Sequence, residues 1–131
     1  MRPQQRLLLA FPPLVSLFFL GCGPGGPERY HVSGQVTHKG QPVPAGTIIF
    51  EPDFSKGNDG PQGRALIKAG AFDTAAADGI GTVGGPHNIT ILGTDGQNPT
   101  ETSPQGKPLF APYITTAELP KEKGKLDFTV P

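Results

Sequence analysis

Three histidines, His31, His38 and His87, are the only imidazole side chains in the chain. A zinc or hydrolytic site would need several of them, or one with a carboxylate and a nucleophile, to converge on one point. No two histidines stand two residues apart, the spacing that places side chains on the same face of a strand. We therefore expect no catalytic residue and no three-ligand metal site, and we predict that these histidines are exposed strand and turn residues.

Acidic and amide side chains gather in two further segments. Asp53, Asn58 and Asp59 lie in a glycine-rich loop, and Asp73 and Asp78 lie in a second one. Oxygen ligands of this kind bind calcium when a loop folds around the ion. Neither segment has the ligand order of an EF-hand loop, and Asp and Asn also favour turns through local hydrogen bonds. Turn formation is the expectation, and calcium binding stays open as the alternative.

Two other patterns have structural interpretations. The glycines of residues 79–85 are not followed by a predicted helix, so they do not form a dinucleotide-binding loop. The lysines of residues 121–125 alternate with an acidic residue and lead into a predicted strand. Because 11 basic residues balance 11 acidic ones over the whole chain, we expect no nucleic-acid binding and no bound cofactor.

Four large side chains, Tyr30, Phe110, Tyr113 and Ile114, raise the possibility of an exposed aromatic strip. Such a strip stacks on sugars or docks a partner protein. Packing of the same side chains into the core is the competing interpretation. Both remain open from the sequence.

Alternating apolar and polar residues indicate that strands position these side chains. The chain has 131 residues with 19 Gly and 16 Pro, but its 35% hydrophobic and 17% charged residues do not match a typical disordered chain. Turn residues separate the apolar segments. The expected strands cover residues 32–37, 47–50, 65–67, a short stretch around 72, 87–92 and 126–130. The pattern predicts an all-β protein, an antiparallel β-sandwich of about seven strands.

The N-terminus has the order of a secretory signal. Arg2 and Arg6 precede an almost wholly apolar segment, residues 7–20. As a helix this segment would rise only about 21 Å, against a hydrocarbon core of about 30 Å, so a permanent membrane span is not expected. We predict a signal segment over residues 1–21, a Gly/Pro-rich tether over 22–29 and the β-sandwich over 30–131.

The sequence Phe19-Leu20-Gly21-Cys22 resembles the lipobox of bacterial lipoproteins. The resemblance implies that Cys22 receives a diacylglycerol and becomes the N-terminus after cleavage. The commonest form of the motif has Leu where this chain has Phe19. Gly23, in place of an Asp after the cysteine, favours the outer membrane if the cell has two membranes. Since Cys22 is the only cysteine, an intramolecular disulfide is excluded.

Residues 32–37 and 39–50 resemble the opening of a carboxypeptidase regulatory-like domain, a transthyretin-like seven-stranded sandwich. Residues 70–74 and 84–91 resemble later strands of small lipoproteins of this type from planctomycete bacteria. The resemblance implies fold and location, and it carries over no catalytic residue.

The expected function is that of a non-enzymatic, exported protein anchored to the cell envelope through lipidated Cys22. It would act as a binding or structural module for another protein or an extracellular polymer. The alternative is a small binding domain for a soluble ligand, for calcium at residues 53–59 or for a glycan on an aromatic face.

Overall fold

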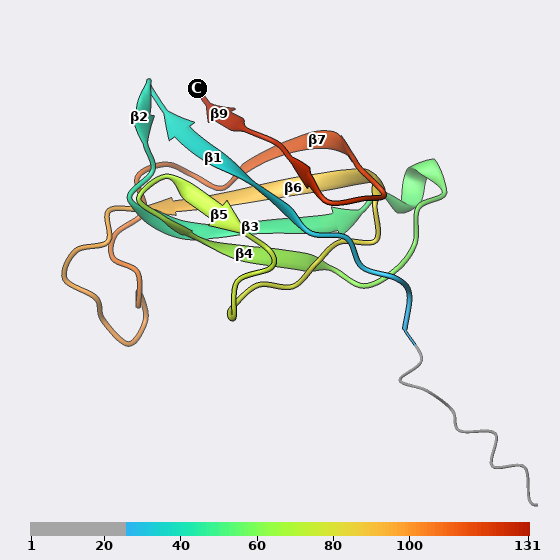
Figure 1. Ribbon diagram of the computed structural model, residues 1–131. Helices are drawn as coiled ribbons and strands as arrows, with labels where there is room; N and C mark the ends of the chain where they lie inside the picture. Colours follow the sequence, from blue (N-terminus) through green and yellow to red (C-terminus); the bar gives the residue numbers. More distant parts are fainter. Residues whose placement is uncertain (1–25) are drawn as a thin grey trace, which may run out of the picture.

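The computed structural model describes residues 26–131, so the predicted signal segment and Cys22 lie outside the described residues. The described chain is all-β, as predicted, and its strands form one continuous hydrogen-bonded sheet that curls into a half-barrel (Figure 1). The strands are β1 (Val32–His38), β2 (Gln41–Pro42), β3 (Ala45–Pro52), β4 (Gly63–Lys68), β5 (Ala71–Asp73), β6 (Gly85–Thr94), β7 (Tyr113–Leu119), β8 (Gly124–Lys125) and β9 (Phe128–Val130). A single 3-10 turn, η1 (Phe54–Lys56), lies between β3 and β4.

The strand order is β2-β1-β5-β4-β3-β6-β7, and every pair in this order is antiparallel. The predicted antiparallel sheet is therefore present. The C-terminal strands differ, because β8 and β9 both pair with β1 in parallel. This pairing adds the end of the chain to the strand that begins the fold.

Two tight turns set the hairpins β1–β2 and β4–β5. Lys39 and Gly40 have φ values of 51° and 78°, and Ala69 and Gly70 have values of 50° and 80°. Two consecutive residues with positive φ give the type I′ geometry that matches the twist of the flanking strands. Each turn closely follows a segment that was predicted as a strand, residues 32–37 and 65–67.

Strand alternation builds the core. Ile48 and Phe50 of β3 and Ile89 and Ile91 of β6 are completely buried. Phe50 also lies among aromatic rings from two distant strands: its centroid is 5.8 Å from that of Phe72 and 6.5 Å from that of Phe128. The core thus ties β3, β5, β6 and β9 together.

The C-terminal segment was predicted as one uninterrupted strand over residues 126–130, but it divides at Leu126 and Asp127. The Asp127 carboxylate accepts the backbone N–H of Gln35 at 2.9 Å, in place of a backbone carbonyl. Leu126 donates its N–H to the Ser33 carbonyl at 2.9 Å. A Cβ on Gly34 would lie 1.7 Å from the Leu126 carbonyl oxygen, so this close approach requires glycine at position 34.

Candidate functional site at the β7 edge

The histidines are not all exposed, so that part of the prediction was wrong. His31 is exposed, His38 is half-buried with its ring 4.6 Å from that of Phe110, and His87 is only 1% exposed. Nδ1 of His87 lies 2.9 Å from the Gly85 carbonyl oxygen, which holds the ring in the core. No group of three potential metal ligands exists within residues 26–131.

The polar residues of loop 53–63 fix the loop itself. The Asp53 carboxylate accepts the backbone N–H of Ser55 at 3.1 Å and caps η1. Asn58 donates its side-chain N–H groups to the carbonyl oxygens of Gly84 and Pro86, at 3.0 and 2.7 Å. These contacts attach the loop to the start of β6, so Asp53 and Asn58, two of the three residues considered for calcium, serve as capping and loop-anchoring groups.

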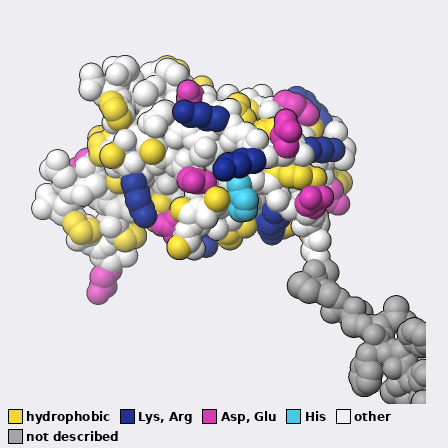
Figure 2. Space-filling view, in the orientation of Figure 1, with side chains coloured by type: hydrophobic (Ala, Val, Ile, Leu, Met, Phe, Trp, Pro, Cys, Tyr) yellow, Lys and Arg dark blue, Asp and Glu magenta, His cyan; other side chains and the backbone are white. Residues whose placement is uncertain are grey.

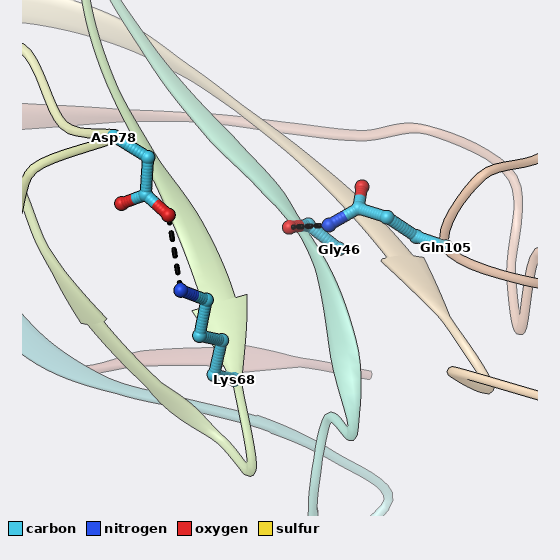
Figure 3. Close-up of polar contacts among 4 residues, drawn as sticks. All are labelled: Gly46, Lys68, Asp78 and Gln105. Atoms are coloured by element: carbon cyan, nitrogen blue, oxygen red, sulfur yellow. Dashed lines mark hydrogen bonds and ion pairs between the residues drawn. The ribbon is translucent and has the colours of Figure 1, made fainter.

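The second acidic segment is also engaged locally. The Asp73 carboxylate accepts the N–H of Ala75 at 2.8 Å, and Asp78 pairs with Lys68 at 3.0 Å (Figure 3). The hydrogen bond from Lys68 lowers the pKa of the Asp78 carboxyl group from its ordinary value. A cavity of about 210 Å³ lies here, lined by Leu66, Lys68, Ala71, Phe72, Asp73, Ala76 and Asp78. It is smaller than the roughly 300–1,000 Å³ of typical ligand pockets.

The four residues of the predicted aromatic strip do not form a common surface. Tyr30 pairs with Thr82, whereas Tyr113 pairs with Ile91 of β6. Phe110 lies over Gly93, where an added Cβ would be 2.4 Å from the ring. Phe110 and Tyr113 pack against the core, so the core-packing interpretation holds for both. Ile114, by contrast, is 67% exposed.

Ile114 belongs to β7, a strand that the sequence analysis did not identify. Pro112 and Pro120 flank β7 directly, and the strand itself contains neither proline nor lysine. Among the described residues its one pairing partner is β6, so β7 is an edge of the sheet. Proteins commonly protect such edges with proline, lysine, bulges or short strands. β7 has seven residues and one charged side chain, Glu118.

The other strands at the margins are better protected. β2 has two residues, one of which is Pro42, and β9 has three residues. β1, the first strand, has neighbours on both sides. β7 is therefore the longest unpaired edge in the described part of the chain.

The hydrogen-bond alternation of the sheet shows which backbone groups of β7 are free. The Asp53 N–H donates to the Pro86 carbonyl at 2.9 Å, so the even-numbered residues of β6 bond towards β3. The odd-numbered residues of β6 then bond to the odd-numbered residues of β7 that face them. The N–H and C=O groups of Ile114, Thr116 and Glu118 consequently point away from β6, and each of these residues is exposed.

Apolar side chains on the outer face of the sheet lie next to the β7 edge. Ile49, Thr90 and Ile114 lie in one row across β3, β6 and β7. Leu92, which is 36% exposed, is diagonal to Ile114 on the same face. The free backbone N–H and C=O groups of β7 therefore lie beside a surface that is partly apolar.

Loop 95–112 covers a different part of this face. Gln105 donates its side-chain N–H to the Gly46 carbonyl at 2.8 Å (Figure 3). The side-chain oxygen of Gln105 also accepts a hydrogen bond from the Thr47 hydroxyl at 3.2 Å. The loop is thus attached to β3, and Gly106 within it is buried.

Within residues 26–131, no helix has the length and hydrophobicity needed to cross a bilayer. Comparisons with protein-family models, with curated proteins and with solved structures each found no match for the chain.

Proposed function

We propose that this protein is a non-enzymatic envelope module, anchored by lipid on Cys22, that binds an extended segment of a partner protein along β7. The observation that carries the binding role is the seven-residue edge whose free backbone groups lie on three exposed residues. Edges of this kind accept an added strand from another chain. The anchor is supported by the signal pattern and by the lipobox resemblance of residues 19–22.

The fold and location belong to the same proposal. We assign the half-barrel to the carboxypeptidase regulatory-like sandwiches on the sequence resemblance of residues 32–37 and 39–50, which form the opening strands β1 to β3. The protein is exported, and Gly23 favours the outer membrane in a cell with two membranes.

A protein partner fits the edge better than a polysaccharide or an ion. A peptide backbone supplies the alternating donors and acceptors that the free groups of β7 require. A sugar would need an exposed aromatic platform, and Phe110 and Tyr113 pack against the core instead. The partner strand should place an apolar residue beside Ile114 and a basic residue beside Glu118.

Replacing Thr116 by proline tests the edge specifically. The substitution removes an N–H that points away from β6 and places a ring on the open side, where edge strands tolerate proline. We expect Thr116→Pro to keep the fold and to lower co-purification of the partner from crosslinked native envelopes by about tenfold or more, since one buried hydrogen bond and a steric block are involved.

Thr116→Val is the matched control, because it keeps the N–H and the β-branched shape. It should retain the partner at the wild-type level. Equal recovery with the proline and valine variants, both folded by circular dichroism, would contradict strand pairing at β7.

A further inference from the structure

One end of the half-barrel lies at the start of the domain, and the other end lies away from it. Arg29 donates to the carbonyl oxygens of Gly81 and Gln62, at 2.9 and 3.3 Å. Gln62 ends the loop that carries η1, and Asn58 of that loop is bonded to residues at the start of β6. The incoming chain and η1 therefore share one end of the molecule (Figure 1).

That end presents a strongly exposed large apolar side chain. Phe54 is 80% exposed, the highest value among the exposed large hydrophobic residues of the described chain. Its position is fixed, because Asp53 caps the turn and the Gly57 N–H donates to the Phe54 carbonyl at 3.0 Å. The ring thus projects from an ordered turn with little protein around it.

The short tether holds this end near the bilayer. Arg29 is seven positions after Cys22, which corresponds to at most about 25 Å of fully extended chain. Loop 95–112 follows the opposite end of β6, and a ten-residue strand spans roughly 30 Å. An anchored domain can therefore bring Phe54 to the membrane more readily than it can bring the far loop.

Charge does not favour contact of this end with an anionic surface. In the sequence, Lys56 is three residues from Asp59 and Lys121 is next to Glu122. Figure 2 shows basic and acidic side chains mixed at the end where the chain begins. The attraction would come from burial of the aromatic ring, which salt does not screen.

We propose that Phe54 inserts into the lipid interface and that the η1 end of the domain faces the membrane, leaving the β7 edge accessible to a partner. This inference rests on the proposed lipid anchor at Cys22. It adds a second contact that sets the orientation of the domain on the bilayer.

Tryptophan fluorescence tests the orientation, because the chain has no tryptophan of its own. Phe54→Trp is introduced into the full chain, which is purified from membranes and reconstituted into phosphatidylethanolamine and phosphatidylglycerol vesicles with brominated acyl chains. We expect the brominated lipid to quench Trp emission by roughly half or more, since an interfacial side chain lies within about 5–10 Å of the acyl boundary. The quenching should persist in high salt.

Leu109→Trp is the matched control, because Leu109 is 42% exposed and donates its N–H to Gly93 near the far end of β6. Its emission should be unaffected by the brominated lipid. Equal quenching of the two variants, or none at Phe54→Trp in a vesicle-bound protein with acylated Cys22, overturns the inference alone. An intact mass with unmodified Cys22 overturns the anchor, and this inference with it.

Discussion

Cys22→Ser should abolish acylation and, once the leader is cleaved, release the protein from the membrane fraction, with a fall in membrane partitioning of about two orders of magnitude or more. A single acyl chain gives only marginal binding, whereas two or three chains hold a protein stably. Detergent-phase partitioning with immunoblotting measures the change.

Phe19→Leu is the control for this prediction, because it converts the motif to its commonest form and should leave the anchor in place. An uncleaved leader can itself hold a protein in the membrane pellet. Intact mass spectrometry therefore has to show whether the leader was cleaved and whether Cys22 carries acyl chains. Wild-type protein with an unmodified Cys22, or a cleaved Cys22→Ser variant that stays in the membrane fraction, would contradict the anchor.

Phe50→Ala should cause the largest loss of stability in the described domain. Phe50 is fully buried, and its ring lies among those of Phe72 and Phe128. Removing a buried Phe side chain costs about 3–5 kcal/mol, a large part of the roughly 5–15 kcal/mol that holds a domain folded. Because each kcal/mol lowers Tm by about 4–8 °C in a domain of this size, thermal unfolding followed by circular dichroism should show the effect clearly.

Phe54→Ala provides the matched comparison, because the same side chain is removed from a site that is 80% exposed. Its free energy of unfolding should change by no more than about 0.5 kcal/mol. Similar losses of Tm for the two variants would show that the Phe50 cluster does not hold the sheet together.

The predicted strands were those whose alternation was strongest. β1 carries Val32 and Val36 at inward positions, and β6 carries Ile89 and Ile91. Gly40 and Gly70 supply the positive φ that the second position of each hairpin turn needs. These signals are local, so a single sequence carries them. Cys22 is likewise a local prediction, but it lies outside the described residues and stays a prediction.

The β7 edge was missed because its inward face carries a weak signal. Tyr113, Thr115 and Ala117 face the core and are only half-buried, so β7 lacks the strong apolar alternation of a central strand. His87 was misplaced for a related reason, since a histidine at an inward strand position looks polar in a sequence. The parallel pairing of β9 with β1, which places Val36 beside Phe128, could not be predicted from the sequence. Strand alternation identifies which face of a strand is buried, but it does not identify the strand with which it pairs.

The central claim, an anchored domain that pairs with its partner through β7, is tested most directly by photo-crosslinking in native envelopes. A photoreactive phenylalanine analogue replaces Ile114, and the same analogue at exposed Ala76, beyond β5, serves as the control. The account predicts one captured polypeptide at position 114, absent from the control and from the Thr116→Pro background, in a protein whose Cys22 is acylated. No capture at position 114, or capture that Thr116→Pro leaves unchanged, would contradict it.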